Sequence, residues 1–91
     1  MLYMICMNKL KDYSVWRKIF DSHKLLHEKA GMHLEKIWRA ENDSNEIYFY
    51  FRIDNKEKAE AFINDPAYAH VGVEAVVLDG WIKYVEDIIS I

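Results

Sequence analysis

The chain has little cysteine, proline or glycine, and each shortage excludes a class of protein. Its single cysteine, Cys6, excludes an internal disulfide and any CxxC zinc or redox motif. Three glycines leave no glycine-rich loop that could hold a phosphate. Basic residues number 12 against 15 acidic ones and form no cluster, so we expect no nucleic-acid partner.

Long hydrophobic runs are also missing. The apolar start, residues 1–7, is followed at once by Asn8 and Lys9, and it is too short for a membrane span or a signal peptide with its cleavage site. We therefore expect a cytoplasmic protein with no membrane partner.

Large apolar side chains, in contrast, are abundant. Of the 91 residues, 52% are hydrophobic and 14% are aromatic. A domain of this size buries only a modest part of its surface. The surplus therefore either lines a ligand cavity or is buried against another subunit.

Four stretches of the chain are predicted to be strands: residues 2–7, 33–40, 46–53 and 81–88. The first and third are apolar on both faces, which indicates that both faces are covered. Residues 41–45 are turn formers, so the second and third strands should pair as a hairpin. Asp79 and Gly80 predict a turn before the last strand.

Two helices are predicted between these strands. The first starts at a cap formed by Asp12 or Ser14 and runs to about residue 30, where Gly31 fits the C′ position. The second starts at Asp54, three residues before Glu57 as in a capping box, and is interrupted at residues 65–66. The order β-α-β-β-α-β predicts one ferredoxin-like α+β domain over residues 1–91, with both helices on one face of a four-stranded antiparallel sheet.

The third strand predicts what covers each face of that sheet. Ile47, Phe49, Phe51 and Ile53 point one way and suit the helices, whereas Tyr48, Tyr50 and Arg52 point the other way. With Trp38 or Trp81 beside them, these tyrosines would form a large exposed apolar patch. Pairing two sheets across a two-fold axis removes the patch, so we expect a homodimer with a shared barrel interior.

Three motifs carry a resemblance to a known family. The first helix contains D-Y-x-x-W-x-x-x-F-D-x-H from Asp12 to His23, residues 42–47 contain N-x-x-x-E-I, and residues 58–66 contain K-A-x-x-F-I-x-x-P. With these motifs the chain resembles the dimeric α+β barrel superfamily of the antibiotic-biosynthesis monooxygenases. The resemblance implies a homodimer and a superfamily of cofactor-independent oxygenases, haem-degrading enzymes, lactone isomerases and members without known activity.

Within that superfamily, the motif of the haem-degrading members is only partly present. Asn8 resembles the asparagine that they place near their ligand. Their tryptophan on the second helix is replaced here by Phe62, and their histidine falls close to, but not on, His70. Haem degradation is therefore disfavoured, and we expect no cofactor.

The stretch "WRKIFDSH", residues 16–23, contains the first candidates for chemistry. On a continuous helix at about 100° per residue, Trp16 and Phe20 form a packing stripe, His23 lies near its middle and His27 toward one edge. His23 is either a core histidine satisfied by the protein or an acid/base group in a pocket. His23 and His27 are also spaced to share a metal ion, but no third ligand is in phase with them, so we expect no metal.

Cofactor-independent oxidation of an aromatic or quinol-like substrate needs an apolar pocket, a base and a group that stabilises the oxyanion. A non-catalytic ligand-binding or structural dimer remains the alternative, because the aromatic residues can be dimer core and Arg52 can form a cross-strand pair with Glu35 or Glu46. A pocket of several hundred Å³ touching His23, Tyr48 or Arg52 would favour a small-molecule site. The candidate catalytic residues are His23, Asn8, His70 and Arg52, and the candidate residues of a pocket for a small apolar or aromatic ligand are Trp16, Phe20, His27, Tyr48, Tyr50, Phe62 and Trp81.

Overall fold

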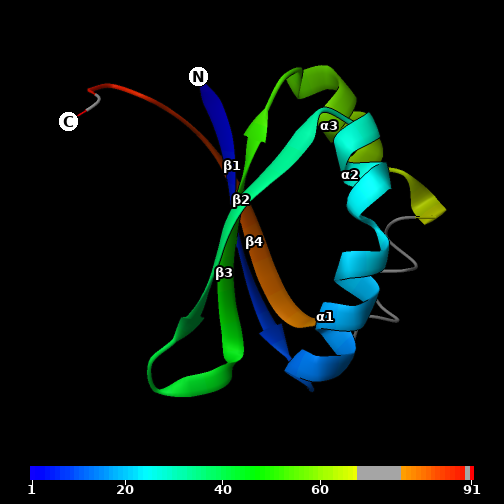
Figure 1. Ribbon diagram of the computed structural model, residues 1–91, viewed down its shortest axis with the longest axis vertical. Helices are drawn as coiled ribbons and strands as arrows, with labels where there is room; N and C mark the ends of the chain where they lie inside the picture. The colour runs from blue at the N-terminus through cyan, green and yellow to red at the C-terminus, as the bar shows by residue number, and fades with distance from the viewer. Residues whose placement is uncertain (68–76, 90) are drawn as a thin grey trace.

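Over the residues that it describes, the computed structural model contains one four-stranded antiparallel sheet in the order β2-β3-β1-β4, with three helices on one face (Figure 1). It describes residues 1–67, 77–89 and 91. This architecture confirms the predicted ferredoxin-like α+β fold. The strands are β1 (Leu2–Leu10), β2 (Met32–Ala40), β3 (Asp43–Ile53) and β4 (Val77–Glu86), and the helices are α1 (Tyr13–Ser22), α2 (Lys24–Lys29) and α3 (Lys56–Ile63).

The first predicted helix is two helices, because the chain turns at His23. His23 ends α1 and precedes α2, with φ −96° and ψ 7°. Asp12 is the N-cap of α1 and accepts a hydrogen bond from the backbone N–H of Val15 at 3.2 Å. The continuous helix expected through residue 30 was therefore wrong. The turn changes the phase of α2 relative to α1, which decides where the two histidines lie.

Two other local predictions need correction. The N-cap of α3 is Asn55, whose side chain accepts from Lys58 N at 3.0 Å, and not Asp54. Asp79 and Gly80 lie inside β4 and form no turn. Gly80 is opposite Asn8 of β1, and a Cβ on it would lie 2.6 Å from both Asn8 Oδ1 and Met7 O. The glycine is needed for this close approach between strands.

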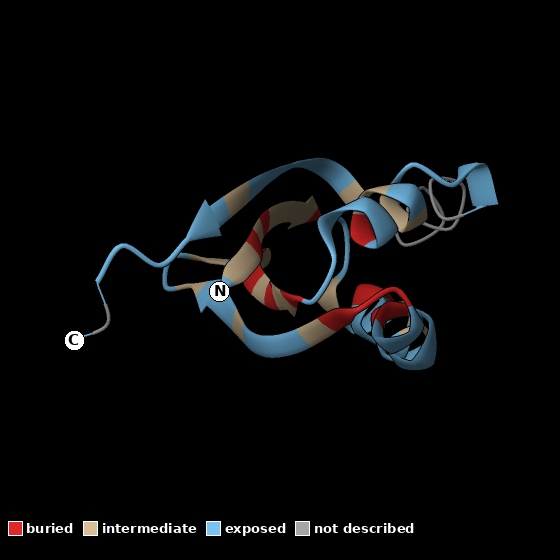
Figure 2. Ribbon diagram, turned by 90° about the horizontal axis from the view of Figure 1, so that it is seen from above, coloured by how far each residue is buried: buried red, intermediate tan, exposed pale blue. Residues whose placement is uncertain are grey.

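The hydrophobic core lies between the helices and the sheet. Met4, Met32 and Ile47, from three neighbouring strands, are its most deeply buried large side chains. The predicted alternation along β3 is confirmed, because residues 47, 49, 51 and 53 are buried whereas residues 48, 50 and 52 are only partly covered. Figure 2 shows the buried positions on the central strands and on the helix faces that oppose them.

The helix-to-strand connection at Gly31 agrees with the sequence. Gly31 has φ +71°, which is the left-handed conformation expected just after a helix end. Its N–H donates to Glu28 O at 3.0 Å, and its carbonyl accepts from Asp54 N at 2.9 Å. The end of α2 is therefore tied to the end of β3. Within the described part of the chain, no helix has the length and apolarity needed to span a membrane.

Candidate functional site

A cleft of about 420 Å³ runs between the α1–α2 pair and the edge strand β2. Its volume lies in the range of small-molecule sites. Apolar walls and charged groups both line it, which is the mixture that binds and orients a drug-sized molecule. The lining residues are Arg17, Phe20, Asp21, Lys24, His27, Glu28, Met32, His33 and Leu34.

His27 forms the buried end of this cleft. Its side chain is the buried polar one among the described residues, with 4% exposure. Its ring centre lies 5.1 Å from those of Phe20 and Phe51 and 5.6 Å from that of Phe62. Burial, with a smaller contribution from His23, lowers the pKa of His27 to about 4. His27 is therefore a neutral imidazole at neutral pH.

Charged side chains form the rim of the cleft. Arg17 Nε lies 2.9 Å from Asp21 Oδ1, one turn further along α1, and an Arg17 terminal nitrogen donates to the hydroxyl of Tyr13. Lys24 and Glu28 project from α2 into the same lining. The cleft therefore offers groups of both signs around an apolar floor.

On the helix side of the sheet, the structure brings four of the predicted pocket residues together. Trp16 stacks on Phe20 at 4.5 Å, and Phe20 and Phe62 both contact His27. Of these, Phe20 and His27 line the cleft. His23 is half-buried, its ring centre is 6.2 Å from that of His27, and it does not line the cleft. The sequence predicted that His23 lies near the middle of the packing stripe and His27 toward its edge, and this was wrong. The turn at His23 puts His27 in the core.

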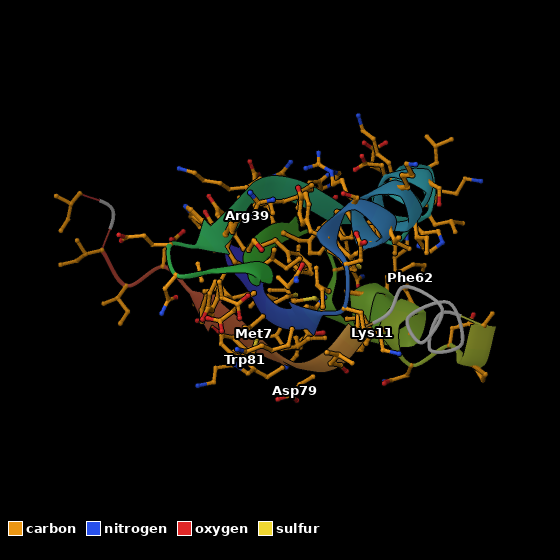
Figure 3. The ribbon with its side chains drawn as sticks, turned by 90° about the horizontal axis from the view of Figure 1, so that it is seen from below. Met7, Lys11, Arg39, Phe62, Asp79 and Trp81 are labelled. Carbon is orange, nitrogen blue, oxygen red and sulfur yellow. The ribbon has the colours of Figure 1, made fainter. Side chains whose placement is uncertain are left out.

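The other predicted site residues lie elsewhere. Tyr48, Tyr50 and Trp81 are on the opposite face of the sheet and do not line the cleft that contains His27. In Figure 3, Phe62 lies on the helix side while Met7 and Trp81 lie across the sheet from it. Asn8 is on β1 opposite Gly80. His70 lies outside the described residues.

Arg52 forms the cross-strand pair that the sequence suggested. Its Nε lies 3.2 Å from Glu35 Oε1, and its terminal nitrogen lies 3.2 Å from Asp54 Oδ1. This pairing occupies the guanidinium within the protein. Arg52 also does not line the cleft.

The sheet face away from the helices carries an aromatic surface, which we call the open face: Tyr3, Trp38, Tyr48, Tyr50 and Trp81. Trp38 stacks on Tyr50 at 5.5 Å, Tyr3 meets Tyr50 edge-on at 5.7 Å, and Tyr48 meets Trp81 at 6.5 Å. Trp38 and Trp81 each remain 42% exposed. A shallow hollow of about 340 Å³ lies on this face beside Tyr3, Trp38 and Tyr50.

The sequence prediction missed His33 as a site residue. A strand residue at this point lines the cleft because β2 is the edge of the sheet and follows directly from α2. The signal was the short connection through Gly31, which forces the start of β2 to lie beside the helix.

A sheet of order β2-β3-β1-β4 with its helices on one face is the ferredoxin-like α+β arrangement. The chain matches no family model and no curated protein. Several solved structures are similar to the chain in fold. SnoaB from Streptomyces nogalater, a cofactor-independent oxygenase, is 6% identical with a TM-score of 0.76, over 98% of this chain and 94% of that one.

Two further structures share the fold. A putative antibiotic biosynthesis monooxygenase from Deinococcus radiodurans is 12% identical with a TM-score of 0.71, over 100% of this chain and 96% of that one. An uncharacterized NIPSNAP domain protein from Burkholderia xenovorans is 14% identical with a TM-score of 0.66, over 96% and 94%. At these identities the likeness establishes the fold, which is that of the monooxygenase-like and NIPSNAP proteins.

Proposed function

We propose that this chain is a homodimeric small-molecule-binding protein whose ligand is a small aromatic compound bound in the cleft between α1–α2 and β2. The observation that carries the proposal is the neutral imidazole of His27, which lies beside Phe20 at the buried end of a cleft of about 420 Å³. Phe20 and His27 present ring surfaces at this end of the cleft, against which an aromatic guest can pack.

The rest of the lining supports an aromatic guest. Phe20, Met32 and Leu34 supply apolar contact area, and Met adapts its shape to planar rings. A charged rim favours a ligand with a polar end directed outward. The cleft does not touch His23, Tyr48 or Arg52, whereas Phe20 and His27, which the sequence also named, line it.

Cofactor-independent oxidation of the bound compound is the second candidate function. It is favoured by the fold shared with SnoaB and by the apolar floor of the cleft, which contains an imidazole group. The low pKa of His27 makes it a weak base for an aromatic hydroxyl, because a general base works best with a pKa near the operating pH. His27 is therefore poorly suited to be the base of such an oxidation.

The homodimer is part of the proposal because of the open face. Five aromatic side chains there include two tryptophans that are 42% exposed. Burial of such a surface against the same surface of a second copy is a self-complementary two-fold contact. The cytoplasmic location expected from the sequence also remains a prediction, which fractionation of cells producing the protein would check.

Calorimetric titration with a panel of quinols, naphthols and anthrones tests the binding function. We expect saturable binding of at least one of them and no binding of aliphatic alcohols of similar size. Oxygen uptake with the same panel then separates the two candidate functions. Consumption of oxygen above the uncatalysed rate supports an oxygenase, binding without it supports a non-catalytic binder, and absence of binding by the whole panel contradicts both.

A further inference from the structure

A second hollow, of about 220 Å³, lies between the start of α1 and the end of β2, and we call it the arginine hollow. It shares Arg17 with the cleft. Among the described residues, its lining contains two guanidinium groups and no carboxylate, although the chain has a formal net charge of −3. A local excess of positive charge of this kind attracts an anion. The lining residues are Tyr13, Arg17, Ile37, Trp38, Arg39 and Ile47.

Arg39 lies on the helix side of the sheet. In the register of β2 and β3 it is opposite Ile47, which is fully buried in the core. Its guanidinium carbon lies over the ring of Tyr13, on α1, at 4.6 Å from the ring centre. A guanidinium stacked on an aromatic face keeps the N–H groups of its planar fork available at its edge. The stack therefore orients Arg39 without using its hydrogen-bond donors.

The donors of the arginine hollow are not used up within the protein. Over residues 1–67, 77–89 and 91, Arg39 makes no hydrogen bond and no ion pair, and its interaction is the stack on Tyr13. The hydroxyl oxygen of Tyr13 accepts from a terminal nitrogen of Arg17 at 3.0 Å, so the hydroxyl hydrogen can be donated to a ligand. Arg17 bonds Asp21 through Nε, which holds its guanidinium in place and leaves further N–H groups.

The backbone at the start of α1 is not part of this site, because its first N–H groups are already bound. Tyr13 N donates to Asn45 Oδ1 at 3.2 Å, and Val15 N donates to Asp12 Oδ1 at 3.2 Å. Asp12 lines an adjoining hollow, where Lys11 adds the opposite charge. The anion would therefore be held by side chains, and the bond from Asn45 fixes the position of Tyr13 among them.

We propose that the arginine hollow binds an organic carboxylate. The two carboxylate oxygens match the paired N–H groups of Arg39, in the bidentate geometry that makes such hydrogen bonds strong. Tyr13 donates its O–H to one of these oxygens, and Arg17 adds a second positive charge. Ile37, in the same lining, offers apolar contact to the organic part of the ligand. The site goes beyond the proposed function, because a neutral aromatic compound in the cleft needs neither Arg39 nor Tyr13.

The test is a titration of the isotope-labelled chain with benzoate in low-salt buffer, followed by chemical shifts. Saturable shifts should appear at Tyr13, Arg17 and Arg39. Arg39→Gln should weaken binding by roughly 5- to 50-fold, since it removes a charge-assisted bidentate contact. Arg39→Lys should also weaken it, because lysine keeps the charge but not the planar fork. Lys24→Gln, which removes one positive charge from the neighbouring cleft, is the matched control and should not change it.

Further arms test the other donor and the class of ligand. Tyr13→Phe keeps the ring under Arg39 and loses one neutral donor, so it should weaken benzoate binding by about 2- to 10-fold. Benzamide, the neutral analogue, should bind at least about fivefold more weakly than benzoate. Inorganic phosphate, which has no apolar part, should also bind more weakly, and phosphate binding as tight as that of benzoate would overturn the organic part of the proposal.

The result for Arg39 decides the inference. Absence of benzoate binding by wild type, or equal binding by Arg39→Gln and wild type, would overturn it. A loss of binding in Lys24→Gln but not in Arg39→Gln would place the anion in the cleft and would overturn it as well. Dihydroxyanthrone, the probe of the cleft, should bind Arg39→Gln and wild type equally, so a failure of the proposed function is seen separately from a failure of the arginine hollow.

Discussion

The ring of His27 lies 5.1 Å from the ring of Phe20, although the two residues belong to different helices. Seven residues along a continuous helix would separate them by about 10 Å along its axis. The contact forms where the chain turns at His23. Residues from both sides of this turn, on α1 and on α2, line the cleft, and the buried His27 is one of them.

The burial of His27 predicts a pH-dependent stability. Its pKa is lowered from 6.5 to about 4 in the folded chain, so the unfolded chain binds the proton first as pH falls. The stabilisation is present above pH 6.5 and is lost between 6.5 and about 4. The loss should reach about 3 kcal/mol in the free energy of unfolding. Urea unfolding across this range measures it.

The matched variant for this prediction is His27→Gln, which cannot titrate. It should be less stable than wild type at neutral pH. Its free energy of unfolding should change much less between pH 6.5 and 4. Carboxylates with lowered pKa, such as Asp54, still destabilise both proteins at more acidic pH. If the free energy of unfolding changes equally with pH in the two proteins, His27 is not held neutral by burial.

Gly80 should be intolerant of even one added carbon. An alanine Cβ would lie 2.6 Å from Met7 O and from Asn8 Oδ1, so β1 and β4 would have to separate. We expect Gly80→Ala to lower the free energy of unfolding by about 1–3 kcal/mol. Because the Met7 clash is with backbone, Asn8→Ala should restore only part of the loss. Chemical denaturation of the single and double variants checks this, and full restoration would refute the strand-contact explanation.

The open face should hold two copies together. Light scattering of wild type at micromolar concentration should give the mass of a dimer. Trp81→Glu places an unpaired carboxylate in the predicted contact and should give a monomer, since burying such a charge costs several kcal/mol. Leu25→Glu, at a 70% exposed position of α2, is the control and should remain dimeric. A monomeric wild type would contradict the predicted homodimer.

The sequence predicted the fold well where periodicity was the deciding signal. Alternation along residues 46–53 identified the faces of β3, and Gly31 marked the end of a helix. The prediction failed at His23, because no glycine or proline marks the turn and local spacing alone favours one long helix. It also assigned Gly80 to a turn, because a close approach between strands depends on a residue far away in the sequence, here Asn8.

The candidate site was less predictable than the fold. Phe20 and His27 were named and do line the cleft, but they were grouped with Tyr48, Tyr50 and Trp81 across the sheet. The pairing of His33 with Asp54 joins residues 21 positions apart, and it depends on where the edge strand starts relative to the end of β3. Such a pairing follows from the register of strands, which single-sequence patterns specify only loosely.

The most direct test of the proposed cleft is to locate a bound aromatic compound within it. Amide chemical shifts of the isotope-labelled chain, titrated with dihydroxyanthrone, should move most in α1, α2 and the start of β2. Leu34→Glu, which adds a charge to the cleft wall, should weaken binding by about tenfold or more, whereas Leu25→Glu on the outer face of α2 should leave it unchanged. Shifts confined to the open face, or equal binding by Leu34→Glu and wild type, would contradict the account.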